Sequence, residues 1–325
     1  MTTGILLAMV PHGRRPHDMH FDIVPTVLMV LALALSSSGE ARELCGEKGI
    51  WIQILGSGGP ELNDERAPAS YLVWIEGKSR LLVNTGPGST VAFDLVGGRI
   101  EDLEAIVYTQ LRAEHASDFP AFVEGSRFGE RRRALPVFGP AGNEMMPSMK
   151  QFVDAMIGPH GAFRHLQDFL TYNSSGGFRI SARDVPSTGR RVWARFATQN
   201  LRLASIPVHH GDIPAIAWRV NIGEQSITFS GDFSNQKNTL VELADETDAL
   251  VVHHSIPESA RGDAREHHAR PSQIGRVARD ADVRMLLVSH RMHQTLGRES
   301  LSIAAIETYY RGPILFANDL DCWGL

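Results

Sequence analysis

The sequence predicts an α/β domain arranged as a four-layer αββα sandwich. Short apolar, β-branched runs alternate with helix-like segments, which is the pattern of an α/β domain. The runs fall into two series separated by a helical stretch at 146–170, and each series is flanked by helices. A chain of 325 residues, 43% hydrophobic and 21% charged, is ordinary globular material with enough length for a large core. Two sheets packed face to face beneath outer helices satisfy this pattern.

The first strand series begins where the export-like N-terminus ends. Its expected strands are 50–55, 71–75, 80–83, 105–109 and 135–138. The second and third of these are joined by a hairpin turning near Glu76 and Gly77. A helix is expected over His115–Glu124. Apolar residues at helical spacing between Met146 and Leu170 predict two more helices, divided at Gly158-Pro159.

The second series repeats this alternation down to the C-terminus. Its expected strands are 192–197, 201–208, 216–222, 226–230, 249–253, 285–289 and 314–317. Helices are expected over 237–244, 272–281 and 298–310. No Pro/Ser/Gly-rich linker divides the chain after Cys45, so we expect one domain over residues 42–325.

Residues 1–41 are expected to be an export segment. Basic Arg14 and Arg15 precede an apolar run over Ile23–Leu35, and small residues follow it. The run is short for a membrane span, so we expect the protein to be exported and this segment to be cleaved, with a retained anchor as the alternative and Met19 as an alternative start. A periplasmic or secreted protein without stable membrane insertion after signal removal is the expectation.

The two cysteines lie near the ends of the mature chain. An exported protein meets oxidising conditions, so Cys45 and Cys322 form either a disulfide or two buried thiols. Spacing alone does not decide between these alternatives, because it does not give the distance between the Cα atoms.

The charge balance is acidic. A net charge of −5 argues against a protein that depends on contacts with a phosphate backbone, so we expect no nucleic-acid partner. The single basic cluster, Arg127 with Arg131–Arg133, is expected to be a solvated loop.

Polar residues follow the predicted strands at their ends, where α/β folds gather their active sites. The set comprises Asn84, Gln110, Arg112, Glu114, His115, His210, Asp232, His253 and His290. Because one such residue means little and a convergent series means more, these side chains are expected to form one site.

With these residues in view, the sequence resembles the metallo-β-lactamase superfamily, in particular its tRNase Z-like and arylsulfatase-like hydrolases. The resemblance extends from about Ile50 to the C-terminus. It is carried by segments in matching order and spacing, namely 55–60, 82–86, 108–115, 208–211, 230–232, 252–254 and 288–290. Each segment alone is a weak signal, but their combination is specific.

The family's metal signature is altered in this chain. The pattern Thr-His-x-His-x-Asp-His is replaced here by Thr109 to His115, with Gln110 and Arg112 at the two first-site histidines and Glu114 at the aspartate. Asn84 stands where the family usually has aspartate. The resemblance therefore implies an impaired first metal site.

The resemblance also implies which ligands remain. They are Glu114, His115, His210, Asp232 and His290, with His209 as an alternative to His210. Such nitrogen and oxygen donors suit one zinc ion, with iron or manganese as alternatives. Arg112 opposes a first cation, because its guanidinium always carries charge. A polar network without metal is the alternative for these residues.

The resemblance implies catalytic roles for Asp232, His253 and Arg112. Arg112 would stabilise the developing anion. His253 matches a histidine that supports the metal ligands or donates a proton, with a structural role as its alternative. His267, His268 and His293 are expected to be solvated.

Three hypotheses for the function follow. The first is a hydrolase of small-molecule ester, phosphodiester or sulfate-ester substrates with at most one metal. The second is a non-catalytic descendant that binds an anion at Arg112. A ribonuclease Z-like nuclease is a minor third hypothesis, because it conflicts with the export signal and the acidic charge balance.

Overall fold

Two seven-stranded mixed sheets form the centre of the computed structural model, which describes residues 45–171 and 177–325. The first sheet has the spatial order β14 (Cys322–Gly324), β1 (Ile50–Gly56), β2 (Ser70–Ile75), β3 (Lys78–Val83), β4 (Ala105–Val107), β5 (Leu135–Pro140) and β6 (Ile180–Val185). The second has the order β13 (Ile314–Phe316), β12 (Leu286–Ser289), β11 (Ala249–His253), β10 (Gln225–Phe229), β9 (Ala215–Ile222), β8 (Arg202–Val208) and β7 (Trp193–Ala197).

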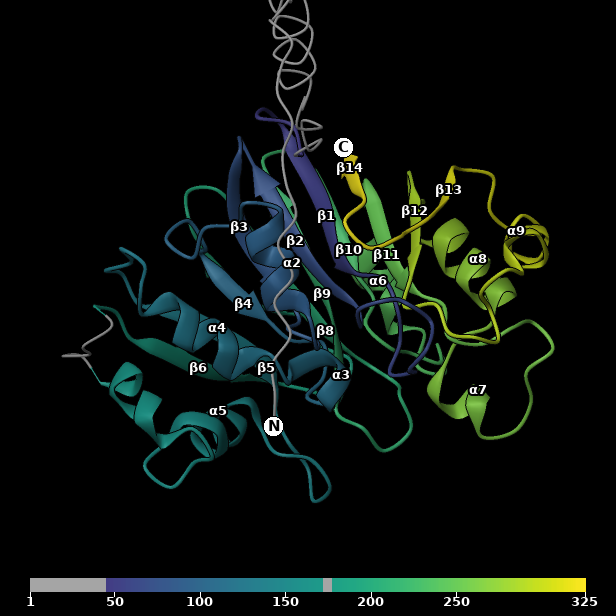
Figure 1. Ribbon diagram of the computed structural model, residues 1–325. Helices are drawn as coiled ribbons and strands as arrows, with labels where there is room; N and C mark the ends of the chain where they lie inside the picture. The colour runs from purple at the N-terminus through teal and green to yellow at the C-terminus, as the bar shows by residue number, and fades with distance from the viewer. Residues whose placement is uncertain (1–44, 172–176) are drawn as a thin grey trace, which may run out of the picture. The chain divides into compact units, whose positions relative to one another are not determined.

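Helices cover the outer faces of both sheets (Figure 1). The first half contains α2 (Ser89–Leu95), α3 (Ala113–Ala116), α4 (Phe119–Ser126), α5 (Met149–Ile157) and the 3₁₀ helix η1 (Arg164–Leu170). The second half contains α6 (Thr239–Ala244), α7 (Ala264–His267), α8 (Pro271–Asp280) and α9 (Glu299–Ile306). The predicted αββα sandwich is therefore confirmed.

Alternation along the strands produces the layers. On β2, Val73 faces the core between the sheets, whereas Leu72 and Trp74 face the core beneath the helices. On β11, Val251 and Val252 divide in the same way. Central strands buried on both faces require nearly continuous apolar runs, which is why the sequence revealed them. Each such aliphatic side chain contributes about 1.5–3 kcal/mol through burial.

Two expected helical regions differ from the structure. The single helix predicted over His115–Glu124 is wrong, because the chain forms α3 and α4 with a break between them. Pro120 lies in the first turn of α4, where its missing N–H and fixed φ are tolerated. After α5, the second predicted helix is the 3₁₀ helix η1 rather than an α-helix.

Arg131 also departs from the expected solvated loop. Its side chain is buried and donates to four main-chain carbonyls, those of Ile100, Leu103, Arg133 and Ala134. Burial, followed by the charge of Arg133, lowers the pKa of Arg131 to about 10. The arginine therefore holds together the loops that enter β4 and β5.

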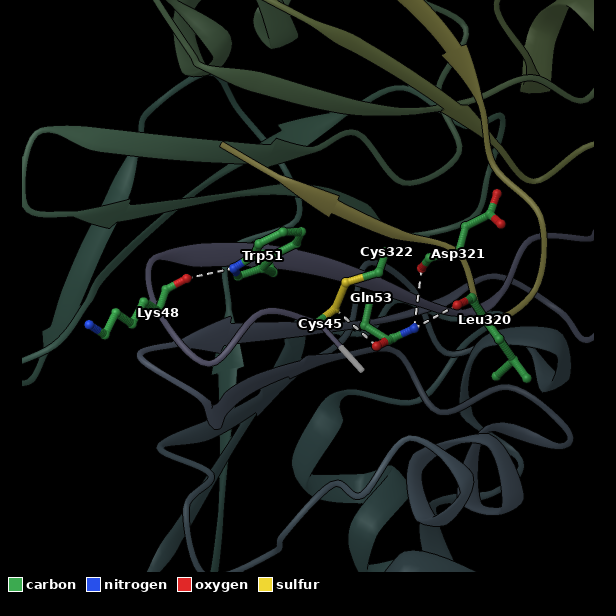
Figure 2. The surroundings of a disulfide bond; sticks show 7 residues. All are labelled: Cys45, Lys48, Trp51, Gln53, Leu320, Asp321 and Cys322. Atoms are coloured by element: carbon green, nitrogen blue, oxygen red, sulfur yellow. Dashed lines mark hydrogen bonds between the residues drawn. A yellow bond between two sulfur atoms is a disulfide. The ribbon is translucent and has the colours of Figure 1, made fainter. Parts of the chain in front are cut away.

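A disulfide between Cys45 and Cys322 resolves the question of the two cysteines (Figure 2). Their Cα atoms lie 5.7 Å apart, and β14 pairs antiparallel with β1 beside them. Gln53 supports this edge by donating to the carbonyl of Leu320 at 2.8 Å. In the described part of the chain, no helix is long and apolar enough to cross a membrane. The expected export segment over residues 1–41 lies outside the described residues.

Candidate metal centre

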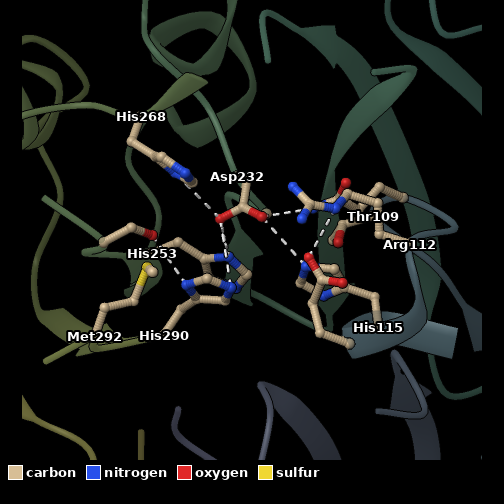
Figure 3. Close-up of polar contacts among 12 residues, drawn as sticks. Thr109, Arg112, His115, Asp232, His253, His268, His290 and Met292 are labelled. Carbon is tan, nitrogen blue, oxygen red and sulfur yellow. Dashed lines mark hydrogen bonds and ion pairs between the residues drawn. The ribbon is translucent and has the colours of Figure 1, made fainter. Parts of the chain in front are cut away.

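The site lies where several strands end. Asp232 follows β10, His210 follows β8, His253 ends β11 and His290 follows β12. His115 comes from the other half of the sandwich, on α3 just after β4. The convergence predicted from strand ends thus occurs, and Figure 3 shows His115, His253, His268 and His290 around Asp232.

Asp232 is the centre of this cluster and is buried. Its Oδ2 lies 3.2 Å from His115 Nε2 and 3.9 Å from His210 Nε2, and it accepts a hydrogen bond from Gln110 Nε2. Its Oδ1 faces the other side, 3.0 Å from His253 Nδ1 and 3.7 Å from His290 Nε2. One carboxylate therefore connects two groups of imidazoles.

The electrostatics keep Asp232 ionised. Burial opposes its charge, but His290 and the hydrogen bonds from His115 and His253 outweigh burial and hold the pKa of Asp232 well below its usual range. Burial lowers the pKa of His210, His253 and His290 in spite of the attraction of Asp232. Neutral imidazoles keep a lone pair for a metal ion or a proton.

Two of these imidazoles have a buried nitrogen with no hydrogen-bond partner in the described chain. They are His210 Nε2 and His290 Nε2, both directed towards Asp232. The opposite nitrogen is occupied in each case: His210 Nδ1 donates to the carbonyl of His267 at 2.7 Å, and His290 Nδ1 contacts Ser255 Oγ at 2.9 Å. Such outer contacts orient metal-binding histidines in proteins. The residues present therefore fit a metal ion.

Two groups of donor atoms are close enough to hold an ion. The first contains His115, Asp232, His253 and His290, and the second contains His210, Asp232 and His268. Mixed imidazole and carboxylate donors of this kind suit zinc, iron or manganese. Within the described residues these are the two such groups, and they share Asp232.

His253 has both ring nitrogens engaged. Nδ1 faces Asp232 Oδ1, and Nε2 lies 3.1 Å from the hydroxyl of Tyr71, which is itself buried. Burial raises the pKa of Tyr71, so this hydroxyl stays protonated. Because His253 Nδ1 donates to the ionised Asp232, the other ring nitrogen carries the lone pair and accepts from Tyr71. His253 is therefore the middle of a hydrogen-bonded chain from Tyr71 to Asp232 and supports the carboxylate.

Glu114 and Arg112 pair with each other at the margin of the cluster. Arg112 Nε lies 3.0 Å from Glu114 Oε1, and the Arg112 side chain is 40% exposed. Glu114, expected from the resemblance as a ligand, is not in either donor group. Its carboxylate neutralises Arg112 instead, which weakens the repulsion that the guanidinium would exert on a cation.

The structure places two more histidines differently from their expected positions. His209, the alternative to His210, contacts Ser234 Oγ at 2.7 Å and lies outside both donor groups. The solvated position expected for His268 is wrong, because its Nδ1 lies 3.6 Å from Asp232 Oδ1 and its side chain is 19% exposed. Sequence reasoning missed His268 because it follows the four-residue helix α7 and no apolar strand.

Comparison with known proteins agrees with the fold. The family model described as "Beta-lactamase superfamily domain" matches residues 79–291. Ribonuclease Z of Haloferax volcanii is 24% identical over 82% of this chain and 92% of its own length, and that of Nocardia farcinica is 23% identical over 83% and 95%. The metallo-β-lactamase fold protein YhfI of Bacillus subtilis has a TM-score of 0.63 at 19% identity, covering 84% of this chain and 98% of its own. Human tRNase Z, short form, has a TM-score of 0.65 at 16% identity with the same coverage.

These comparisons correct one expectation. The exclusion of a nucleic-acid partner is contradicted, because both curated relatives are named ribonuclease Z. The exclusion rested on the net charge of the whole chain, which does not report the charge at one site. Arg112, partly exposed beside the cluster, is an example of positive charge that the overall balance conceals.

Proposed function

Because this chain belongs to the β-lactamase superfamily, we propose that it is a metal-dependent hydrolase of phosphodiesters, RNA among them. The observation that carries the proposal is the pair of buried, unpartnered nitrogens on His210 and His290 that face the ionised Asp232. Leaving such groups unpaired costs about 1–3 kcal/mol each, so an arrangement that retains them favours a ligand.

A bound zinc, iron or manganese ion would supply Lewis acidity and lower the pKa of a bound water. Asp232 and the surrounding histidines would hold that ion, while the chain from Tyr71 through His253 keeps Asp232 in place. Ser255 and the carbonyl of His267 keep His290 and His210 oriented. The protein itself thus supplies buried ligand atoms that its own hydrogen bonds hold in position.

Arg112 supports the choice of phosphodiesters over neutral esters. Its guanidinium is permanently charged, is 40% exposed and is anchored by Glu114 through Nε. The terminal nitrogens are left to approach the non-bridging oxygens of a phosphate, and the charge would stabilise the anion that develops during hydrolysis. The ribonuclease Z relatives support the same substrate class.

A substrate panel tests this choice. Zinc-loaded protein is incubated with bis(p-nitrophenyl) phosphate, p-nitrophenyl sulfate and p-nitrophenyl acetate, with Arg112→Ala and the exposed-site control His293→Ala alongside. We expect turnover of the phosphodiester, reduced about 100-fold by Arg112→Ala and unchanged by His293→Ala. Turnover of the acetate alone, unaffected by Arg112→Ala, would show that the substrate class is wrong.

A specific observation favours a second candidate, a non-catalytic protein that binds an anion. Gln110, at a position where the family has a metal-binding histidine, donates instead to Asp232. In that case phosphate or RNA would bind at Arg112 without being cleaved. Binding of a labelled RNA that Arg112→Ala abolishes, with no product after prolonged incubation with zinc, would favour this candidate.

We also propose that the protein is exported. The disulfide between Cys45 and Cys322 supports an oxidising environment, and the basic and apolar pattern of residues 1–41 supports a cleaved leader. Mass measurement of the protein purified from its native cell fractions tests this. A cytoplasmic protein retaining all 325 residues would contradict it.

A further inference from the structure

We propose that a single metal ion binds between His210, Asp232 and His268, and that Asn84 withdraws His115 from metal binding. The inference rests on the proposed metal dependence and goes beyond it, because it assigns the ion to one of the two donor groups. It gives His268 the role of a ligand and His115 that of a hydrogen-bond donor.

His268 offers a free nitrogen on the side of Asp232 opposite to His115. Its Nδ1 lies 3.6 Å from Asp232 Oδ1, which is beyond hydrogen-bond distance, and neither ring nitrogen has a hydrogen bond to the rest of the described chain. The donor atoms of His210, Asp232 and His268 all lie within 4.8 Å of one another. That spacing allows one ion to contact all three after small side-chain shifts.

The dipeptide His267-His268 organises this group. The carbonyl of His267 accepts from His210 Nδ1 at 2.7 Å, which fixes the proton there and leaves the lone pair on Nε2. The next residue supplies the second imidazole, whose ring centroid lies 5.2 Å from that of His210. One short segment at the end of α7 therefore orients one ligand and provides another.

Asn84 gives His115 the tautomer opposite to that of His210, with the ring proton on Nε2 instead of Nδ1. The Asn84 side-chain oxygen accepts from the backbone N–H of Thr109 at 2.9 Å and from its hydroxyl at 3.2 Å. The Asn84 amide nitrogen is thereby turned towards His115 Nδ1, 3.2 Å away. An amide nitrogen only donates, so His115 Nδ1 must accept, and the ring proton lies on Nε2. His115 Nε2 then donates to Asp232 Oδ2 and has no lone pair for a metal ion.

His253 likewise has no lone pair to offer an ion at the first donor group. Its Nε2 accepts from Tyr71, so its Nδ1 carries the proton and donates to Asp232 Oδ1. His290 is then the only imidazole of that group with a free lone pair. In the second group, the hydrogen bond to His267 leaves the lone pair of His210 on Nε2, and no hydrogen bond to the described chain holds a proton on His268 Nδ1. An ion at the second group obtains two nitrogens and a carboxylate, and His290 Nε2, the unpartnered nitrogen of the first group, is left to pair with water or substrate rather than with the ion.

Zinc binding to the apoprotein tests the assignment. Protein stripped with EDTA is titrated with zinc, and bound metal is measured by elemental mass spectrometry after gel filtration. We expect about one equivalent in the wild type. His268→Ala and His210→Ala should weaken binding at least about tenfold, whereas His115→Ala and the neighbouring control His267→Ala should retain the equivalent. His268→Gln, with a side chain similar in size to histidine, should lose zinc binding in the same way. Circular dichroism shows which variants are folded.

Asn84→Asp provides an independent test. A carboxylate at this position accepts from His115 Nδ1 and frees Nε2, so the variant should bind a second equivalent of zinc. The charge-matched control Asn221→Asp, on β9, should bind one equivalent of zinc, like the wild type. Nitrogen-15 NMR of the histidine rings, assigned with His115→Ala, should place the His115 proton on Nε2 in the apoprotein and on Nδ1 in Asn84→Asp.

The outcomes separate this inference from the proposed function. One equivalent that is lost in His115→Ala but kept in folded His268→Ala would overturn the inference and leave the metal-dependent hydrolase standing. A His115 proton on Nδ1 in the wild type would also overturn it. No zinc binding by the wild type would overturn both.

Discussion

Acid is expected to destabilise the apoprotein through its buried histidines, and His254 is the one whose contribution is most readily isolated. Its ring is fully buried, with Nε2 3.2 Å from Ser302 Oγ and Nδ1 without a partner in the described chain. Burial, followed by the charge of Arg291, lowers the pKa of His254 from 6.5 to about 4. The folded protein therefore holds this ring neutral at pH values where the unfolded chain protonates it.

The sign follows from proton uptake. As the pH falls below about 6.5, the unfolded state binds a proton that the folded state refuses, so the free energy of unfolding decreases until the folded-state pKa of about 4 is reached. The full effect is about 3 kcal/mol, of which about 2 kcal/mol is lost between pH 7.5 and pH 5. The depressed pKa values of His210, His253 and His290 act in the same direction.

Denaturant unfolding measured by tryptophan fluorescence checks this value. Wild type and His254→Gln are compared at both pH values, with EDTA present so that bound metal does not contribute. We expect the difference between the two pH values to be about 2 kcal/mol smaller in His254→Gln, whatever its absolute stability. The same pH-dependent loss in both proteins would refute the assignment to His254.

Three further predictions concern stability and packing. Cys322→Ser should lower the free energy of unfolding by about 2–5 kcal/mol, since the disulfide closes a separation of 277 residues, and reduced wild type should match the variant in denaturant unfolding. Arg131→Ala should cost about 3 kcal/mol in the same assay, because four buried carbonyls lose their donor, and an unchanged midpoint would show that water replaces it. Gly86→Ala should lower the melting temperature, because its Cβ would collide with the carbonyl of Glu114 and displace α3; a calorimetric scan that matches wild type would contradict this.

The sequence predicted the central strands well because burial on both faces leaves a long apolar signal. β11 and β12 are examples, as all their residues are buried. Edge strands leave a weaker apolar signal in the sequence. β6 contains Ser181, Arg183 and Asp184, and β14 has only three residues, one of them a cysteine, so neither was predicted. Their positions depend on pairing with β5 and β1, which local sequence does not specify.

The site was predictable where a ligand follows a strand and not where tertiary contacts decide its role. Asp232, His210 and His290 were expected from their positions after apolar runs, and the structure brings them together. The pairing of Glu114 with Arg112 and the approach of His268 depend on how α3 and α7 dock. Neither helix has more than four residues, so neither gives a periodic signal.

The most direct test of the proposed function is cleavage of a 5′-labelled single-stranded RNA by the zinc-loaded protein, with Asp232→Asn as the variant and EDTA as the metal control. We expect cleavage that requires zinc and falls at least about 1,000-fold in Asp232→Asn, since the central carboxylate would be lost. Equal cleavage by wild type and Asp232→Asn, or cleavage that persists in EDTA, would contradict it.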